Sequence, residues 1–361
     1  MLQRDLSGSK KKMRMKKEFA DNLTQLALSI PKVELHLHLE GAIPLQTLFE
    51  LIQETGDEPS IKTVEDLQKK LMYTDFAHFI QLWLWKNRFI KEEKTFERIT
   101  YEVLYTLHNQ NVKYVEAFYS PSDYQQQGLS PQKITEYIIK GKQRAYNDFG
   151  IRCELIMDIV RGDGVKIGFQ RLEEVTPYLR KGVIGIGLGG SEQKFPADPY
   201  GPVYKEAKHR GFRLTAHAGE AAGAESIWAV ITKLGVDRIG HGVSAYEDPQ
   251  LVSLLKERQI PLEMCVVSNV KTKVCESFKA HPITQYYQQG LLITVNSDDP
   301  TMFNTTISAE YNVLARKLGF SLHDLKRVSI NGITASFMPE MEKESMKSQF
   351  EKEWEHILAK Y

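Results

Sequence analysis

The chain has 361 residues, 42% of them hydrophobic, which is enough for a large core and within the size range of one domain of alternating strands and helices. Its 47 basic and 46 acidic residues leave a net charge of +1, so the composition predicts no general attraction to nucleic acid or to an anionic membrane. A small uncharged substrate fits this balance.

Cysteine content and hydropathy set further limits. The three cysteines, Cys153, Cys265 and Cys275, form no C-x-x-C pair, which indicates a reducing compartment. No segment approaches the roughly 20 apolar residues of a membrane span, and the beginning of the chain lacks the apolar core of a secretory signal. We therefore expect a cytoplasmic protein that binds neither nucleic acid nor membrane.

The first residues are basic. Residues 1–20 contain a cluster of lysine and arginine between positions 10 and 17, which predicts a disordered tail, with a nucleic-acid-binding or targeting arm as the alternative. Residues 21–361 contain no low-complexity linker and no fixed short repeat. We expect them to form a single domain.

The first strong pattern is a strand. A helix expected over Asp21–Ile30 is ended by Pro31, and the following segment Val33–His38 alternates as a strand does. The alternation puts His36 and His38 on one face and the apolar residues on the other. Two imidazoles in this arrangement can reach one ion.

The next stretch, residues 45–108, has helical periodicity and predicts a helical insertion after the first strand. An apolar and aromatic face repeats in it at helical spacing, and its members are Phe76, Phe79, Ile80, Trp83 and Leu84. This face either packs on the core or forms an apolar lid over a site at the strand ends.

Strands and helices then alternate to the end of the domain. With Val33–His38, the expected strands are Tyr114–Phe118, Cys153–Ile159, Val183–Leu188, Arg213–His217, Arg238–His241, Pro261–Cys265 and Leu292–Asn296. Eight strands with helical crossovers predict an α/β fold, a TIM-type (β/α)8 barrel, with an open doubly wound sheet as the alternative. The residues from Lys317 to Tyr361 predict extra C-terminal helices with breaks at Gly332 and Pro339.

Polar residues gather where these strands end, and they are His36, His38, His217, His241, Asp298 and Asp299. A single histidine there is more often a hydrogen-bonded structural residue, and Asp-Asp-Pro is more often a helix N-cap. Six of them in register with eight strands instead favour one site on the rim of a barrel. Imidazoles with a carboxylate suit zinc or another borderline divalent ion, which lowers the pKa of a bound water.

Further positions near these strand ends have side chains or backbone suited to a substrate. Glu220 follows His217 by three residues and can hold a proton without binding the metal, while His241 is placed to orient or deprotonate water. Asp299 remains to hydrogen-bond a heterocycle. The glycine-rich segment 185–190 does not fit the dinucleotide pattern, so we expect Gly189 and Gly190 to let a flat ligand approach the main chain.

Together these motifs resemble the ordered signature of the adenosine and adenine deaminases, which are metal-dependent amidohydrolases. The resemblance runs from about Pro31 to Ala335. The segments that carry it are His36-x-His38, Tyr114-Val115-Glu116, Gly187-Leu188-Gly189-Gly190-Ser191-Glu192, His217-Ala218-Gly219-Glu220, Arg238-Ile239-Gly240-His241-Gly242 and Asn296-Ser297-Asp298-Asp299-Pro300.

The resemblance implies one Zn²⁺ per subunit and hydrolytic release of ammonia from the 6-amino carbon of a purine. It implies that the metal ligands are His36, His38, His217 and Asp298. It implies that the catalytic residues are Glu220, which protonates the ring, His241, which helps to generate hydroxide, and Asp299, which binds the imidazole-ring nitrogen. It implies that the substrate-binding residues are His38, Glu40, Gly190 and Asp299, with the Gly190 amide meeting the pyrimidine-ring nitrogen on the sugar side.

Departures from the family pattern bear on the substrate. Glu40 stands where adenosine deaminases usually have Asp, as in adenine deaminases and enzymes of 5′-modified adenosines, and the segment from Gly187 replaces the form Asp-Leu-Ala-Gly-Asp-Glu. Pro300-Thr301-Met302-Phe303 resembles the nucleoside branch. We favour adenosine or a 5′-modified adenosine, such as aminodeoxyfutalosine or methylthioadenosine, over free adenine.

Two further functions stay open. A related amidohydrolase could hydrolyse a cyclic amide or a phosphoester with the same metal. A catalytically altered binding protein with the same barrel is disfavoured, because every ligand and acid-base position of the family is filled in this sequence.

Overall fold

The structure is a computed structural model that describes residues 22–74 and 76–361. The predicted basic tail, residues 1–20, lies outside the described residues. The strands in the described ranges are β1 (Lys32–His38), β2 (Val112–Tyr119), β3 (Arg152–Val160), β4 (Val183–Gly189), β5 (Arg213–Ala218), β6 (Arg238–His241), β7 (Leu262–Met264) and β8 (Ile293–Val295). All eight predicted strands are confirmed, with ends that differ by at most two residues.

The strands are parallel and follow one another in the order β1 to β8. The ring is closed by the segment after β8, because Asp298 bridges to Leu37 of β1. The backbone N–H of Asp298 donates to the His36 carbonyl at 2.9 Å, and the N–H of His38 donates to the Asp298 carbonyl at 3.0 Å. The predicted (β/α)8 barrel is confirmed, and the open doubly wound sheet is wrong.

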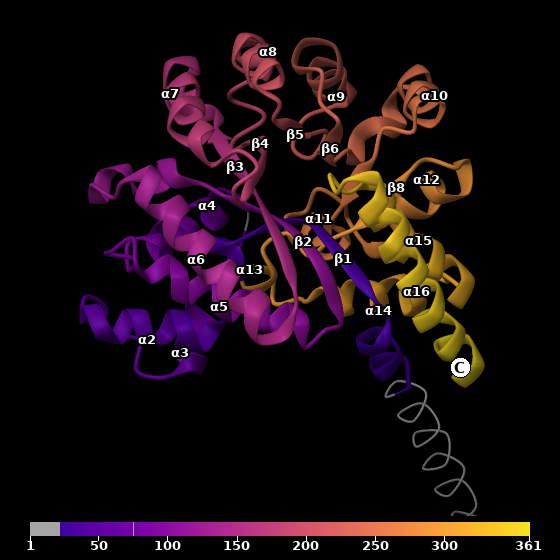
Figure 1. Cartoon of the computed structure of the whole chain (residues 1–361), viewed down its shortest axis with the longest axis horizontal. Helices are drawn as coiled ribbons and strands as arrows, with labels where there is room; N and C mark the ends of the chain where they lie inside the picture. Colours follow the sequence, from indigo (N-terminus) through magenta and orange to yellow (C-terminus); the bar gives the residue numbers. More distant parts are fainter. Residues whose placement is uncertain (1–21, 75) are drawn as a thin grey trace, which may run out of the picture.

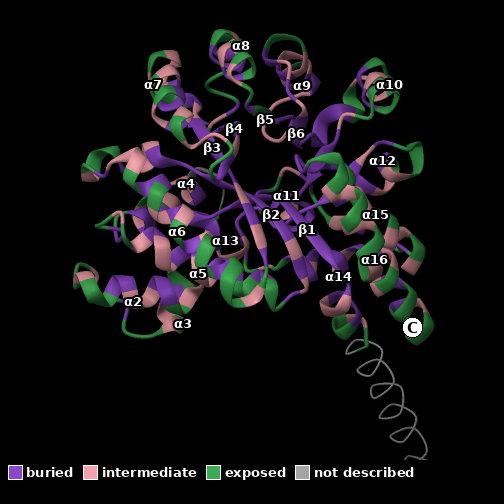
Figure 2. Cartoon of the chain, viewed as in Figure 1, coloured by how far each residue is buried: buried purple, intermediate pink, exposed green. Residues whose placement is uncertain are grey.

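The strands are buried on both faces, as in a sheet covered by helices, although β1 alternates polar with apolar residues. Every residue of β1 is buried, and so is almost all of β2 and β4. Figure 2 shows the buried strands at the centre and exposed residues on the outer sides of the surrounding helices. The polar side chains at the strand ends therefore lie where solvent is largely excluded.

Helices cross over between the strands, and Figure 1 shows them arranged around the barrel. The crossover helices are α6 (Pro131–Phe149), α7 (Val165–Val175), α8 (Gly201–Arg210), α9 (Ala224–Ala229), α10 (Pro249–Arg258) and α12 (Ile283–Gln289). Local sequence sets their beginnings. Asp248, for example, accepts a hydrogen bond from the Gln250 amide at 2.8 Å, and Pro249 occupies the first turn, where no N–H is needed.

Shorter helical segments adjoin the strands and crossover helices. They are η1 (Glu40–Ala42), η2 (Pro121–Gln127), η3 (Arg161–Asp163), η4 (Thr176–Tyr178), η5 (Asp198–Tyr200), η6 (Val230–Leu234), η7 (Val243–Glu247), α11 (Val266–Lys271), η8 (Phe278–Ala280) and α13 (Pro300–Phe303). Among the described residues, no helix has both the length and the apolar character needed to cross a membrane.

The predicted helical insertion follows β1. It contains α2 (Leu45–Thr55), α3 (Val64–Lys70), α4 (Phe76–Asn87) and α5 (Thr95–His108). The aromatic face of α4 turns toward the carboxyl end of the barrel, where Phe79 stacks on Phe303 at 5.1 Å and Trp83 lies 6.1 Å from the ring of His38. The lid interpretation of this face is therefore favoured, since α4 covers the strand ends.

The C-terminal helices are α14 (Ile307–Leu318), α15 (Leu322–Ala335) and α16 (Glu340–Lys360). The predicted break at Gly332 is wrong, because α15 continues through it. Gly332 instead allows α15 to lie against β1, since a Cβ atom there would be 3.0 Å from the Cβ of Val33. The predicted break at Pro339 is confirmed, because it separates α15 from α16.

Helix α16 is part of the barrel's outer layer, and Trp354 anchors it. The indole is fully buried, and its Nε1 donates to the Ser329 hydroxyl of α15 at 3.3 Å. We expect Trp354→Ala to lower the free energy of unfolding by about 3–5 kcal/mol, because it leaves a large cavity. Urea denaturation would measure this, with the exposed neighbour Glu355→Ala as control, and equal stability of the two variants would contradict the assignment.

Candidate active site and metal centre

Imidazoles and a carboxylate from four parts of the barrel meet at one point. The Nε2 atoms of His38 and His217 are 3.1 Å apart, and Asp298 Oδ1 lies 3.5 Å from His36 Nε2 and 3.5 Å from His38 Nε2. Ligand atoms of His36, His217, His241 and Asp298 also lie within 4.8 Å of one another. The sequence prediction that the strand ends converge is confirmed.

The cluster has the properties of a metal site. His36 Nε2 is buried and has no hydrogen-bond partner, although it faces the other donors. Burial lowers the pKa of His38 to about 3 and that of His217 well below its usual value, so both rings are neutral, as metal ligands must be. A nitrogen-rich donor set with one carboxylate suits a borderline divalent cation.

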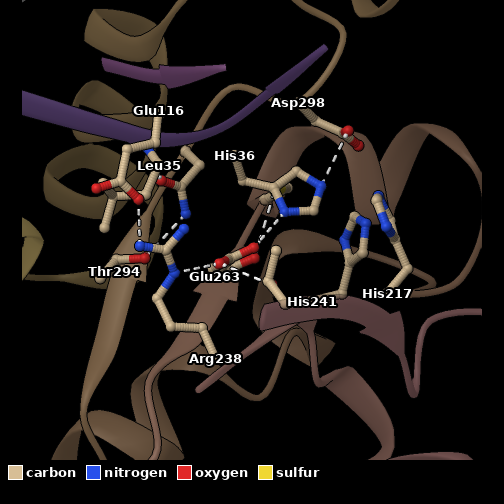
Figure 3. A network of polar contacts seen from close by, with 12 residues as sticks. Leu35, His36, Glu116, His217, Arg238, His241, Glu263, Thr294 and Asp298 are labelled. Carbon is tan, nitrogen blue, oxygen red and sulfur yellow. Dashed lines mark hydrogen bonds and ion pairs between the residues drawn. The ribbon is translucent and has the colours of Figure 1, made fainter. Parts of the chain in front are cut away.

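A chain of buried charges fixes the orientation of His36. Glu263 Oε2 lies 2.7 Å from His36 Nδ1, which keeps the proton on Nδ1 and turns the lone pair of Nε2 toward the site. Arg238 in turn donates through Nε to Glu263 at 2.6 Å, and it also pairs with Glu116. Figure 3 shows this chain running from Asp298 through His36 to Arg238 and Glu116.

The other ligand candidates are fixed in the same way. His217 Nδ1 lies 3.1 Å from the Leu188 carbonyl, which directs its Nε2 to the cluster. The Ser268 hydroxyl donates to Asp298 Oδ2 at 2.6 Å and leaves Oδ1 facing the imidazoles. Sequence reasoning did not single out Glu263 or Ser268, because nothing in a linear pattern tells which buried polar residue lies behind a ligand.

His241 lies at the edge of the cluster. Its Nε2 is 3.6 Å from Glu220 Oε2, and its Nδ1 is 3.1 Å from the Asn269 side-chain nitrogen. His241 and Asp298 both have φ of +62°, a strained conformation for residues other than glycine, and such strain is typical of functional sites. The position of His241 between the other imidazoles and Glu220 suits either a ligand or a base.

The loop that carries Glu220 is held by Glu192. The Glu192 carboxylate accepts hydrogen bonds from the backbone N–H groups of Gly219 at 2.6 Å, Glu220 at 3.1 Å and Ala221 at 2.8 Å. Burial, together with the charges of Asp298 and Glu192, raises the pKa of Glu220 to about 8. Glu220 can therefore be protonated at neutral pH.

A cavity of about 330 Å³ opens on the cluster. The predicted site residues that line it are His38, Gly190, His217, Glu220, His241, Asp298 and Asp299. His36 lies behind it, and Glu40 is buried beside it, where its Oε1 accepts a hydrogen bond from the amide of the lining residue Ser120 at 2.9 Å. Asp123 and Asp158 also line the cavity, and the sequence prediction missed both.

A barrel that gathers imidazoles and a carboxylate around a cavity at the carboxyl ends of its strands is the architecture of a metal-dependent hydrolase. The family model described as adenosine deaminase matches residues 31–353. The chain therefore belongs to the adenosine deaminase family, and it is a hydrolytic deaminase of the metal-dependent amidohydrolase type.

Relatives with different substrates are similar to nearly the same extent. The adenine deaminase of Wolinella succinogenes is 33% identical, covering 89% of this chain and 97% of the relative, and the adenosine deaminase of Clostridium kluyveri is 32% identical, covering 88% and 92%. A Burkholderia ambifaria amidohydrolase with bound Zn superposes with a TM-score of 0.86 at 26% identity, covering 93% and 94%. The Arabidopsis thaliana N6-methyl-AMP deaminase gives 0.81 at 26% identity, covering 91% and 98%.

The carboxylate behind His36 offers a test of the metal centre. We expect Glu263→Gln to weaken metal binding by about 10-fold to 100-fold, because the amide no longer fixes the Nδ1–H form of His36. Competition with a chromogenic chelator would measure the affinity. Glu257→Gln, on the exposed side of α10, is the matched control, and unchanged affinity in Glu263→Gln would show that the cluster does not use this carboxylate.

Proposed function

We propose that the protein is a zinc-dependent deaminase of a 6-aminopurine nucleoside. The substrate is adenosine or a 5′-modified adenosine such as aminodeoxyfutalosine or methylthioadenosine, and the products are the inosine-type nucleoside and ammonia. The observation that carries the proposal is the meeting of the histidine and aspartate cluster with Glu220 in one cavity of about 330 Å³.

His36, His38, His217 and Asp298 would hold the ion. Zinc is supported by the donor set, by the unpartnered Nε2 atom of His36 and by the bound Zn of the Burkholderia ambifaria relative. A divalent ion held by these residues would lower the pKa of water toward neutrality and so would supply hydroxide at neutral pH. The substrate itself is bound and protonated by the protein.

Glu220 is the proton donor in this proposal. Glu220 lines the cavity, and the Glu192 carboxylate accepts a hydrogen bond from its backbone N–H at 3.1 Å, which holds the loop in place. Glu220 would protonate the ring nitrogen beside the reacting carbon, which would make that carbon more electrophilic. His241, whose pKa burial lowers to about 4, is neutral and can accept a proton from the attacking water.

Two groups would orient the purine. Asp299 lines the cavity, where its carboxyl would bind the imidazole-ring nitrogen. Gly190 lines the opposite wall with φ of +93°, and its amide would meet the pyrimidine-ring nitrogen on the sugar side. Apolar residues of α4, including Phe79 and Trp83, cover the ring plane and exclude water.

A nucleoside is favoured over a free base by the extent of the cavity. It reaches from the histidine cluster to Asp123, which accepts a hydrogen bond from Trp83 Nε1 at 2.7 Å, and its volume is in the range of sites for whole small-molecule ligands. Free adenine is the second candidate, supported by Glu40 and by the Wolinella succinogenes relative. A binding protein without activity is disfavoured, since all the catalytic positions are occupied.

Glu220→Gln tests the acid. The variant is expected to keep its metal and to lose about 10²-fold to 10⁴-fold in kcat, because glutamine cannot donate the proton. Metal content by mass spectrometry and ammonia release would be measured together. His217→Ala serves for comparison, since it is expected to lose both metal and turnover, and near-normal turnover in Glu220→Gln would make the assignment of the acid wrong.

Removal and replacement of the metal test the reaction. Chelated protein is expected to be inactive, and Zn²⁺ is expected to restore ammonia release from adenosine or from one of the 5′-modified adenosines. Adenine and a cyclic amide complete the panel. Release from adenine alone would favour the free-base alternative, and no release from any 6-aminopurine would end the deaminase proposal.

A further inference from the structure

Asp158 is a cavity residue that the mechanism above does not use. It lies near the carboxyl end of β3, its side chain is only 3% exposed, and it lines the cavity that holds the histidine cluster. Its Oδ1 is buried without a hydrogen-bond partner. An unpaired buried carboxyl destabilises a fold, so its presence calls for a ligand that pairs with it.

The neighbouring strand leaves space for this carboxyl. A Cβ atom at Gly187 would be 2.5 Å from Asp158 Oδ1, and one at Gly189 would be 2.3 Å from Asp158 Oδ2. Both positions on β4 must therefore lack a side chain while Asp158 is present. The glycine at position 189 was expected to allow close approach of a ligand to the main chain. In the structure it leaves space for the carboxyl of Asp158.

The same geometry explains a departure from the family pattern. The form Asp-Leu-Ala-Gly-Asp-Glu has an aspartate where this chain has Gly187. In this chain the carboxyl of Asp158 occupies the space that the Cβ atom of a side chain at position 187 would need. A carboxyl is therefore present at this point of the cavity wall, but it comes from β3 and not from β4.

The surroundings define which ligand group Asp158 can bind. Among the described residues that line the cavity, none is a lysine or an arginine, and Asp123 adds a second acidic side chain. Two cations are close by, but both are buried and engaged: Lys86 Nζ donates to Asn87 Oδ1 at 2.7 Å, and the Arg161 guanidinium donates to the carbonyls of Phe195 and His217. An anionic group here would lose water without gaining a cation, whereas an uncharged donor would gain a hydrogen bond.

The polar groups around the purine are otherwise assigned. In the proposed function, the histidine cluster, Glu220 and Asp299 would face the reacting carbon, the ring nitrogen bonded to it and the imidazole-ring nitrogen. They come from β1, β5, β6 and the segments after β5 and β8. Asp158 and Asp123 come from β3 and from the segment after β2. They lie on the side of the barrel mouth that supplies no metal ligand, where the non-reacting part of the substrate would extend.

We propose that Asp158 is a substrate-binding residue that hydrogen-bonds an uncharged hydroxyl or ring N–H on the non-reacting side of the 6-aminopurine. This inference rests on the proposed deaminase function. A sugar hydroxyl of a nucleoside and the ring N–H of a free base share this chemistry. A 5′-monophosphate does not, so the nucleotide is a poor substrate.

The test crosses one variant with a set of substrates. Zinc-loaded wild type and Asp158→Ala are compared by kcat/KM on adenosine, its 2′-, 3′- and 5′-deoxy forms, AMP, adenine and 9-methyladenine. If Asp158 binds one sugar hydroxyl, the substitution Asp158→Ala lowers kcat/KM for adenosine about 10-fold to 100-fold. The same substitution then has no effect on kcat/KM for the deoxy form that lacks that hydroxyl. If it binds the ring N–H, the same contrast separates adenine from 9-methyladenine.

The control removes a nearby charge that does not face the cavity. Asp163 is exposed and lies only five residues from Asp158, so Asp163→Ala changes the local field but not the wall, and it is expected to leave every substrate unaffected. Thermal unfolding is a second readout. If Asp158 serves binding at a cost in stability, Asp158→Ala is expected to unfold at the wild-type temperature or above it.

Two results would overturn the inference while leaving the deaminase function in place. One is an equal loss of kcat/KM on every substrate with a lowered unfolding temperature, which would make Asp158 a structural residue. The other is efficient turnover of AMP by wild-type protein. If no 6-aminopurine were deaminated at all, the proposed function would fail, and the role of Asp158 would fail with it.

Discussion

The site depends on how the barrel closes. The two hydrogen bonds between the backbone of Asp298 and the strand of His36 and His38 join the last strand region to the first. The same two bonds bring the only carboxylate of the proposed ligand set beside two of its imidazoles. Closure of the ring and assembly of the cluster are therefore one event, and Asp298 adopts a strained backbone conformation where it occurs.

The buried charges beneath the cluster follow from this arrangement. Arg238, Glu116 and Glu263 are at most 1% exposed, and burial of such charges is costly unless they are paired. The guanidinium satisfies both carboxylates, and it also lies 3.6 Å above the ring of Phe337. Their pairing leaves one Glu263 oxygen for His36. Apolar side chains could give the same stability as this network, but they could not orient the imidazole of His36.

The sequence could predict elements that have a periodic pattern and residues that lie where such a pattern ends. The strands followed from apolar runs, and the convergence of His36, His217 and Asp298 followed from their positions at strand ends, because parallel strands in a barrel end on one rim. What sequence could not predict is which side chains face each other across that rim. Glu192, Glu263 and Asp158 are separated in the chain from the groups they contact, and no periodicity marks them.

Glycine was hardest to interpret from sequence, for the same reason. Gly332 looked like a helix break and is a point of helix-to-strand contact. Gly189 looked like a ligand-approach position, but together with Gly187 it leaves room for a carboxyl from the neighbouring strand β3. A glycine at such a position indicates that there is no space for a side chain. The role of the glycine becomes clear only when the neighbouring residue that occupies this space is known. That neighbour is known only once the strands are placed.

The two sides of the barrel mouth have separate tasks. The strands that supply the proposed metal ligands also carry the proton donor, so a change there would affect the chemistry itself. In the wall formed by β3, β4 and the segment after β2, the Leu188 carbonyl meets His217 at Nδ1 and not at the Nε2 atom that faces the cluster. Substitutions in that wall can therefore alter the part of the substrate that is recognised while the reacting carbon remains in place. Under the proposed function, such a division would let relatives named for a base, a nucleoside and a nucleotide share one barrel, with differences in the β3–β4 wall contributing to the choice of substrate.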